Sequence, residues 1–354
     1  MTYQDLGYKD EIEKYRNEKG LDSFEVGRVI LEHKERYILK TPTQEFDAEL
    51  IVNLRFTAES RFDIPAVGDW VAFTEYDDGK ALIHAIYPRY SIIKRKAVGK
   101  TGQVQIIATN IDYGLIVQSV DRDFNLNRLE RYLTICNSSG VNPVIVLSKI
   151  DLISEIDLEI KTNQIVERLP GVPIVATSSE SIGYTQLNEF IESGKTYCLL
   201  GSSGVGKSTL LNGLSGKEYM KIGELSDALN KGKHTTSHRE LIVLENGGIF
   251  IDNPGMREVG IADSSDGLEI TFELILEYAE QCRFKDCTHN HEKGCAVLEA
   301  VKNGEIDKET FVNYGKLEKE KRHFESDAQE RKKKDKDLGK LIKDVKKQRK
   351  NNKY

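Results

Sequence analysis

The sequence predicts a chain of several domains: an OB-like β barrel at the N-terminus, a doubly wound α/β domain in the centre and an α-helical domain at the C-terminus. Three observations predict this order. Short β-rich segments come first, strands then alternate with helical stretches, and the remainder is helical apart from a cluster of cysteines. At 354 residues the chain is too long for one ordinary domain. We expect the domains to span residues 1–104, 105–268 and 269–354.

The N-terminal barrel is predicted from five β-rich stretches within residues 24–95. Turns and polar residues separate these stretches, and such spacing is typical of a small barrel, of which the OB-fold is one common type. The five stretches are Val26–Leu31, Arg36–Leu39, Ala48–Phe56, Asp69–Phe73 and Ala81–Tyr87.

The central domain is predicted from apolar, strand-like runs that alternate with helical spacing from Ile106 onward. Leu126–Cys136 has the helical spacing and lies between the first two runs. Alternation of this kind predicts a sheet with helices packed on both faces. The runs are Asp112–Gln118, Pro143–Leu147, Pro173–Ala176, Tyr197–Leu200, Glu240–Glu245 and Gly248–Ile251.

Composition favours a cytoplasmic protein that does not contact membranes. The stretch Met1–Tyr15 is polar and mixed in charge, unlike a signal peptide. No apolar run approaches the roughly 20 residues of a membrane span. Five cysteines in a chain of this length argue against a disulfide framework.

Charge is distributed unevenly along the chain. The net charge is −6, yet residues 331–354 hold twelve Lys and Arg against three Asp. The body of the chain is therefore strongly acidic and its tail strongly basic. A basic tail on an acidic body is typical of nucleic-acid contact, although a solvated helix has the same composition.

Residues 201–208, Gly-Ser-Ser-Gly-Val-Gly-Lys-Ser, match the phosphate-binding loop pattern. Its glycines allow backbone N–H groups to surround phosphate oxygens at a helix N-terminus. Lys207 is expected to reach the β- and γ-phosphates, and Ser208 is expected to coordinate Mg²⁺. A Gly-rich turn without function is the alternative. The expected nucleotide-binding residues are Gly201, Ser202, Ser203, Gly204, Val205, Gly206, Lys207, Ser208 and Thr209.

Downstream, an apolar run ends in Asp252-Asn-Pro-Gly255. At this point a P-loop fold needs an acid near Mg²⁺ and a glycine amide near the γ-phosphate. The polar segment 232–238 lies between the two motifs. Its Thr235 and Thr236 are expected to approach the nucleotide, with Thr236 as a second Mg²⁺ ligand. An ordinary exposed loop is the alternative for this segment.

Upstream of the phosphate loop, an apolar run leads into Ser148-Lys-Ile-Asp151. A carboxylate at the end of a strand can accept hydrogen bonds from the N1–H and N2–H₂ of guanine, a donor pair that adenine lacks. Lys149 is expected to lie along the base or ribose, and backbone amides of residues 177–179 are expected to meet guanine O6. The expected base-binding residues are Ser148, Lys149, Ile150, Asp151, Thr177, Ser178 and Ser179.

The order of these motifs resembles that of the circularly permuted GTPases, most closely the ribosome small-subunit-dependent GTPase A family. In ordinary small GTPases the phosphate loop comes first and the base motif late, whereas here residues 148–151 and 177–179 precede residues 201–208. The resemblance covers nearly the whole chain, including the barrel, the Gly-Lys-His-Thr-Thr of residues 232–236 and the cysteine cluster. It implies a circularly permuted α/β P-loop GTPase domain between the barrel and a zinc-binding helical domain.

This chain departs from the pattern of well-known GTPases in two places. Family members generally carry Asn where this chain has Ser148, a shorter side chain that supports one contact fewer. Guanine selection is therefore expected to rest on Asp151. Met256 follows Gly255 in place of a Gln that would orient the attacking water, so intrinsic hydrolysis is expected to be slow. The resemblance offers His234 as the catalytic residue that positions this water, and a loop histidine facing phosphate or RNA is the alternative.

Three cysteines and a histidine crowd together as Cys282-x₄-Cys287-x-His289-x₅-Cys295. Three thiolates and one imidazole suit one tetrahedral structural Zn²⁺ with no open position for chemistry. The resemblance assigns His289 as the fourth ligand, and His291 is the alternative by spacing. Three free cytosolic thiols are the reading without a metal. Zinc would supply folding free energy to a segment that otherwise lacks a core.

The resemblance implies a GTPase that binds the small ribosomal subunit and its rRNA and hydrolyses GTP on that contact, during late assembly or maturation. The barrel, the metal module and the basic tail are each expected to contact RNA. A nucleotide-gated RNA-binding scaffold with incidental hydrolysis is the alternative. A metabolic P-loop kinase is disfavoured because a small substrate requires none of these modules. We expect Mg²⁺ with GTP, one Zn²⁺, no other small-molecule substrate and a monomer.

Overall fold

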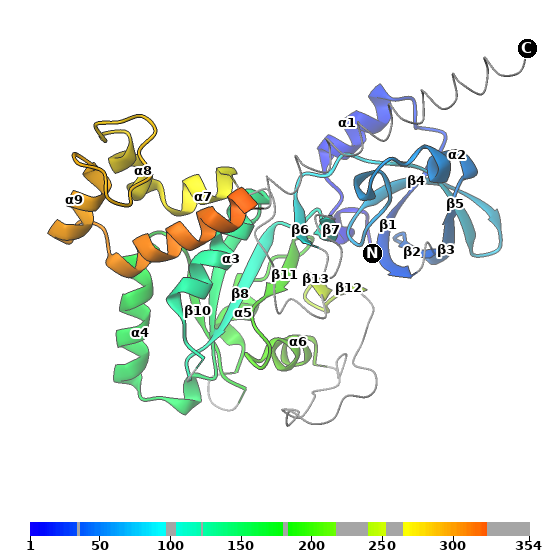
Figure 1. Ribbon diagram of the computed structural model, residues 1–354. Coiled ribbons are helices and arrows are strands. Elements are labelled where there is room, and N and C mark those ends of the chain that lie inside the picture. The colour runs from blue at the N-terminus through cyan, green and yellow to red at the C-terminus, as the bar shows by residue number, and fades with distance from the viewer. Residues whose placement is uncertain are drawn as a thin grey trace, which may run out of the picture.

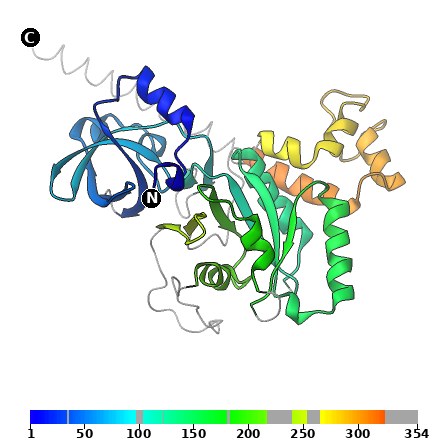
Figure 2. The ribbon, with the colours of Figure 1, turned by 180° about the vertical axis from the view of Figure 1, so that it is seen from behind.

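The computed structural model describes residues 1–33, 36–96, 104–121, 123–179, 183–216, 240–252 and 265–323. A β barrel, a central α/β domain and a group of C-terminal helices follow one another along the chain (Figure 1). The barrel and the C-terminal helices lie on opposite sides of the central domain, as the view from behind also shows (Figure 2). Within the described ranges, every helix is too short or too polar to traverse a lipid bilayer.

Five strands close the N-terminal barrel and confirm the OB-like prediction. β1 pairs with both β2 and β4, while β3 pairs with β2 and lies parallel to β5, so the ring closes through the pairing of β4 with β5. Buried and exposed residues alternate along β3, as expected where one face lines a core. The strands are β1 (Glu25–His33), β2 (Arg36–Lys40), β3 (Glu45–Leu50), β4 (Trp70–Asp77) and β5 (Lys80–Ile86).

The strand predicted over Ala48–Phe56 is wrong in its second half. β3 ends at Leu50, and the short helix α2 (Val52–Thr57) follows it. Val, Leu and Phe favour strands when a partner strand and a core are present. Both edges of β3 are already paired, and none of the α2 residues is buried, so the β propensity of this segment has no sheet to join.

The N-terminal segment packs against the outside of the barrel. Trp70 is fully buried there, and the ring of Tyr8 meets it edge-on with centroids 5.0 Å apart. Leu6 and Ile12 complete this apolar cluster. The helices of this part of the chain are η1 (Gln4–Leu6), α1 (Asp10–Glu18) and, between β3 and β4 after α2, η2 (Arg61–Asp63).

Six strands form the sheet of the central domain in the order β10-β9-β8-β11-β13-β12. Neighbouring strands are parallel except for β12, which is antiparallel to β13. The carboxyl ends of the parallel strands therefore share one edge, where ligands bind in open α/β sheets. The strands match the six predicted runs: β8 (Tyr113–Ser119), β9 (Asn142–Ser148), β10 (Ile174–Ala176), β11 (Thr196–Leu200), β12 (Glu240–Val243) and β13 (Ile249–Asp252).

Helices cover both faces of this sheet, so its strands are buried on both sides. Neighbouring residues of β8 show this: Ile116 belongs to the apolar cluster under α3, whereas Leu115 and Val117 belong to the cluster under α6. Two-sided burial explains why the strands read as continuous apolar runs. The helices are α3 (Leu126–Ser138), η3 (Ile150–Leu152), α4 (Glu155–Arg168), α5 (Thr185–Phe190) and α6 (Lys207–Ser215).

Backbone pairing and one buried arginine join the barrel to the central domain. Leu31 of β1 pairs with Glu240 of β12, which makes the two sheets continuous. Arg28 is fully buried and donates hydrogen bonds to the carbonyl oxygens of Leu6 and Asn110 and to the hydroxyl of Thr196. A hairpin that the sequence did not predict, β6 (Ile92–Lys96) and β7 (Val104–Thr109), lies between the two domains.

The C-terminal helices pack on α3. Gly267 lies so close to α3 that a Cβ there would stand 2.4 Å from the carbonyl oxygen of Thr134. Arg131 of α3 forms a two-pronged ion pair with Glu320, at 3.0 and 2.7 Å. This region is helical apart from the cysteine cluster, as predicted. Its helices are α7 (Ser265–Thr271), α8 (Glu273–Ala279), α9 (Ala296–Asn303) and the helix of residues 308–323.

Candidate functional site

The predicted nucleotide motifs meet at the carboxyl edge of the central sheet. Ser148 ends β9, Thr177 follows β10, Gly201 follows β11 and Asp252 ends β13. These strands are parallel neighbours or are separated by β8, so segments far apart in sequence converge on one place. The topology therefore brings the predicted base loop (residues 148–151) and the predicted phosphate loop (residues 201–208) together.

Glycine is required at several positions of the phosphate loop, residues 201–208. Gly201 has a φ of 148°, and a Cβ there would stand 2.5 Å from the carbonyl oxygen of Val117. Gly204 and Gly206 have φ angles of 83° and 95°, which other residues rarely adopt. The loop leads directly into α6, whose N-terminus presents backbone N–H groups to an anion.

The Lys207 side chain folds back onto the phosphate loop. Its ammonium donates hydrogen bonds to the carbonyl oxygens of Gly201 at 2.9 Å and Ser202 at 2.5 Å. Both contacts hold the positive charge at the phosphate loop, and Lys207 is itself the first residue of α6. A cation and a helix N-terminus at one place attract phosphate.

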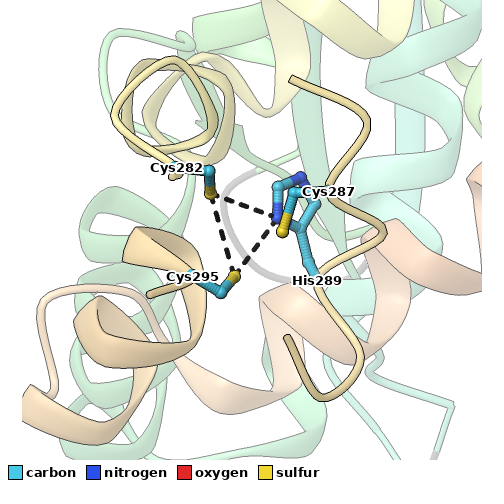
Figure 3. Close-up of side chains that lie close together, drawn as sticks. All are labelled: Cys282, Cys287, His289 and Cys295. Atoms are coloured by element: carbon cyan, nitrogen blue, oxygen red, sulfur yellow. Dashed lines mark hydrogen bonds between the residues drawn. The ribbon is translucent and has the colours of Figure 1, made fainter. Parts of the chain in front are cut away.

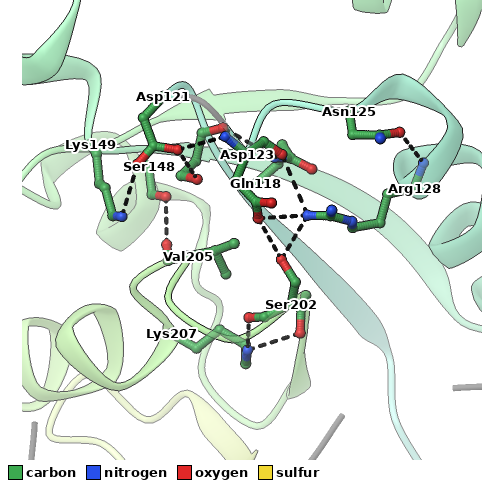
Figure 4. Close-up of polar contacts among 12 residues, drawn as sticks. Gln118, Asp121, Asp123, Asn125, Arg128, Ser148, Lys149, Ser202, Val205 and Lys207 are labelled. Atoms are coloured by element: carbon green, nitrogen blue, oxygen red, sulfur yellow. Dashed lines mark hydrogen bonds and ion pairs between the residues drawn. The ribbon is translucent and has the colours of Figure 1, made fainter. Parts of the chain in front are cut away.

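The base loop contacts the phosphate loop directly. Ser148 is buried, and its hydroxyl donates a hydrogen bond to the carbonyl oxygen of Val205 at 2.7 Å (Figure 4). Lys149 adopts a left-handed backbone conformation with φ 60°, and its ammonium pairs with Asp121 at 3.1 Å. The left-handed turn follows the last residue of β9, where the chain leaves the sheet to form the base loop.

Asp151 and the 177–179 segment also meet. The Ser178 hydroxyl donates a hydrogen bond to the Asp151 carboxylate. The backbone N–H of Thr177 donates to Leu147 at 2.7 Å, and that of Ile150 donates to Thr177 at 3.4 Å. Thr177 and Ser178 are buried while Asp151 and Ser179 are exposed, so the carboxylate stands at the surface of a firmly held pair of loops.

Three polar side chains at this edge were missed by the sequence reasoning: Asp121, Asp123 and Arg128. They follow β8, the strand between the base-loop and phosphate-loop strands, and they touch both loops (Figure 4). Burial raises the pKa of Asp121, but hydrogen bonds from the Asp123 backbone, Ser119 and Lys149 outweigh it, so the pKa lies below its ordinary value. The position after an apolar parallel strand was the signal that could have located them.

Several predicted residues lie outside the described ranges: His234, Thr235, Thr236, Gly255 and Met256. Asp252 is placed as the last residue of β13, where its backbone pairs with Glu240. The basic tail, residues 331–354, also lies outside the described ranges.

Cys282, Cys287, His289 and Cys295 converge on one point, with one ligand atom from each lying within 4.8 Å of the others (Figure 3). The Sγ atoms of Cys282 and Cys295 are 3.8 Å apart, and the Nδ1 of His289 lies 3.6 and 3.4 Å from them. The edges of a tetrahedral zinc site with these ligands measure about 3.8 Å between sulfurs and about 3.6 Å between sulfur and nitrogen. The four side chains therefore fit such an ion, and His291 is not one of them.

The surroundings of the cluster stabilise the thiolate of Cys282 and destabilise the thiolate of Cys295. Burial raises the pKa of Cys282, but backbone N–H groups of Val297 and Ala296 and the neighbouring thiols outweigh this and lower it overall. Burial, the other thiols and the charge on Cys282 raise the pKa of Cys295 to about 11. A bound cation would remove this conflict because it neutralises all of the thiolates.

Comparison with known proteins agrees with this geometry. A family model described as RsgA GTPase matches residues 86–262, and one described as 50S ribosome-binding GTPase matches residues 196–343. A protein of Opitutus terrae named small ribosomal subunit biogenesis GTPase RsgA is 40% identical over 332 residues, which cover 90% of each chain. A protein of Bacteroides thetaiotaomicron named small ribosomal subunit biogenesis GTPase RsgA 1 is 38% identical, and the match covers 98% of this chain and 97% of that one.

Solved structures show the same fold. The crystal structure of YjeQ from Thermotoga maritima matches with a TM-score of 0.61 and 26% identity, covering 82% of this chain and 96% of that one. The structure of YloQ, described as a circularly permuted GTPase, matches with a TM-score of 0.61 and 24% identity, covering 85% and 97%. Permuted motifs, joined nucleotide loops and identity along nearly the whole length all agree, and the chain belongs to the RsgA GTPase family.

Proposed function

We propose that this protein binds and hydrolyses GTP, and that it does so on the small ribosomal subunit during late assembly or maturation of that subunit. The observation that carries the nucleotide part is the contact between Ser148 and Val205, which makes one site of two loops that lie far apart in sequence. Family membership supports GTP hydrolysis as the reaction, and the names of the relatives support the small ribosomal subunit as the partner.

The base half of the site selects guanine through Asp151. Its carboxylate accepts hydrogen bonds from N1–H and N2–H₂ of guanine, while adenine would leave it unsatisfied. Ser178 holds the carboxylate from the other loop. Lys149, held by Asp121, lies along the base or ribose.

The phosphate half of the site neutralises and orients the triphosphate. Lys207 and the backbone N–H groups of the loop bind the β- and γ-phosphates. Ser208 and Thr236 would hold Mg²⁺ beside them, and Asp252 and Gly255 would complete the phosphate side. When bound, Mg²⁺ supplies positive charge that stabilises the charge developing on the phosphate oxygens.

Hydrolysis by the free protein is expected to be slow. Met256 cannot orient a water molecule, so another group has to perform that task. We assign it to His234, whose imidazole would position the water on contact with the ribosomal subunit.

The remaining modules would contact rRNA. The barrel, the C-terminal helical domain and the basic tail each fit an RNA-binding role. The helical domain would hold one structural Zn²⁺ through Cys282, Cys287, His289 and Cys295. We propose a cytoplasmic monomer divided into residues 1–104, 105–268 and 269–354.

One experiment tests this function: GTP turnover by the purified protein alone, with small ribosomal subunits and with large subunits, measured side by side. We expect strong stimulation by small subunits alone. Stimulation by large subunits alone would favour the 50S description of the second matching family. Turnover that neither subunit changes at low salt would favour a nucleotide-gated RNA-binding scaffold.

A further inference from the structure

The described residues between β8 and α3, 120–121 and 123–125, lie beside the phosphate loop. Gln118 is almost fully buried, and its amide donates to the carbonyl oxygens of Asp123 at 2.8 Å and Ser119 at 3.1 Å. Asn125 caps the N-terminus of α3 by accepting a hydrogen bond from the backbone N–H of Arg128 at 3.1 Å. These contacts use neither the Asp123 carboxylate nor the Arg128 guanidinium.

Asp123 of this segment and Arg128 of α3 converge on the phosphate loop. Arg128 and Asp123 form an ion pair of 2.6 Å, and both contact the hydroxyl of Ser202 (Figure 4). The hydroxyl donates to Asp123 at 2.8 Å and accepts from Arg128 at 2.8 Å. A serine hydroxyl has one proton to donate, so this arrangement fixes its orientation.

Ser202 connects this cluster to the charge that binds phosphate. Its side chain belongs to the cluster, while its carbonyl oxygen accepts the hydrogen bond from the Lys207 ammonium. The contacts to the Ser202 hydroxyl therefore position the Ser202 carbonyl group, which is one of the two carbonyl groups that accept hydrogen bonds from Lys207.

Stability alone does not account for this arrangement. The side chains of Arg128 and Asp123 are 28% and 43% exposed, and ion pairs of that exposure contribute little to folding. Burial raises the pKa of Asp123, but the hydrogen bonds from Arg128 and Ser202 outweigh it and keep the pKa below its ordinary value. The carboxylate is thus ionised at neutral pH and remains an acceptor for both partners.

We propose that Arg128 and Asp123 are positioning residues for nucleotide binding, which hold Ser202 and through it the Lys207 ammonium in the geometry that receives the β- and γ-phosphates. This inference rests on the proposed function, because it concerns the same site. It also gives α3 a place in the site, since the helix that carries the C-terminal domain touches the phosphate loop at its first turn.

The test is equilibrium binding of fluorescent GDP and GTP analogues to the full-length protein. Arg128→Gln and Ser202→Ala are each expected to lower the affinity for both nucleotides about five- to tenfold. This is the size expected for the loss of a partly exposed hydrogen bond to a charged group. The double variant should be no more than about twofold weaker than the weaker single variant, because both changes remove one shared contact. Arg128→Lys should retain most of the affinity, since a single nitrogen, Nη1, makes both contacts.

Three readouts separate positioning from general damage. The ratio of GDP to inosine diphosphate affinity should not change, because the base loop is untouched. Arg61→Gln is a matched control: Arg61 is 25% exposed and pairs with Glu32 in the barrel, so its loss should leave nucleotide affinity unchanged. Thermal unfolding should show that each variant is folded, and Ser202→Ala, which removes one oxygen atom, provides the test if Arg128→Gln does not fold.

Two results would overturn the proposal while leaving the function intact: wild-type affinity in both single variants, or losses that add fully in the double variant. A wild-type protein that binds no guanine nucleotide would instead overturn the proposed function itself.

Discussion

The hydroxyl of Ser148 donates a hydrogen bond to the carbonyl oxygen of Val205 at 2.7 Å, so the predicted base loop is tied directly to the predicted phosphate loop. The sequence predicts that Ser148, which is shorter than the Asn usual at this position, supports one contact fewer. In the structure the shorter side chain keeps the contact between the loops, because both residues are buried and close together.

We expect Ser148→Ala to lower the affinities for GTP and GDP equally, by about five- to tenfold. The change removes a hydrogen bond worth about 1 kcal/mol and leaves the buried Val205 carbonyl without this donor. Titration with a fluorescent nucleotide measures the effect. Ser148→Asn restores an N–H donor and should bind at least as tightly as the wild type. Unchanged affinity in the Ala variant would mean that the two loops hold their positions independently.

We expect Asp151→Asn to lower the affinity for GTP by at least about a hundredfold and to raise the affinity for xanthosine triphosphate. A site built to pair with specific hydrogen-bonding groups strongly rejects a ligand that leaves them unpaired, and an Asn amide can donate to the added carbonyl of xanthine. Competition binding with GTP, ATP and xanthosine triphosphate measures this preference. Equal affinity of the wild type for ATP and GTP would contradict the assignment of Asp151.

Much of the fold could be predicted because the central strands are buried on both faces. Ile116 and Val117 pack on opposite sides of the sheet, and such strands read as plain apolar runs. The segment at 52–57 could not be predicted in this way. Its β-favouring residues form a helix because the sheet edges beside it are already occupied, which is a tertiary effect.

The site shows the same division. Its phosphate loop can be recognised in the sequence because phosphate binding requires glycines and a lysine at a fixed local spacing. Asp123 and Arg128 belong to no such pattern, since Ser202 lies 79 and 74 residues further along the chain. Their role depends on the placement of β8 next to β11, which only the sheet order reveals.

We expect purified protein to contain about one zinc ion per chain, as a four-ligand structural site requires. Zinc affinity should rise with pH and fall by at least about tenfold per pH unit on acidification. The reason is that zinc takes thiolates, whereas the pKa of Cys295 is raised to about 11 in the cluster without metal. Competition with a chromophoric chelator at several pH values measures this dependence.

Cys287→Ala provides the matching variant for the metal site. Loss of one ligand should abolish zinc binding and unfold the helices around the cluster, while GDP affinity stays largely intact because the nucleotide loops belong to another core. Protein that lacks metal yet keeps full order in residues 265–323 would rule out a structural metal.

We expect Glu130→Gln to destabilise the protein by about 3 kcal/mol. Glu130 is 1% exposed and forms a two-pronged ion pair with Arg168, itself 8% exposed, at 2.7 and 3.0 Å. Neutralising one partner leaves the other charge buried without its main counterpart. Denaturant unfolding measures the loss. Glu318→Gln, which breaks an exposed pair with Arg322 within one helix, should change stability by less than about 0.5 kcal/mol.

We expect His234→Ala to abolish most of the stimulation of GTP hydrolysis by small ribosomal subunits while sparing GTP binding and subunit binding. Met256 offers no group to align the attacking water, so we expect the free protein to lack a catalytic element that contact with the subunit completes. A single supplied group is worth about 10³–10⁵ in rate in related enzymes, so its removal should be visible as a loss of several decades. Single-turnover hydrolysis at saturating subunits separates this effect from weakened binding, and His238→Ala in the same segment is the control. If His234→Ala keeps full stimulation, the water is positioned by another group, and the subunit itself becomes the first candidate to supply it.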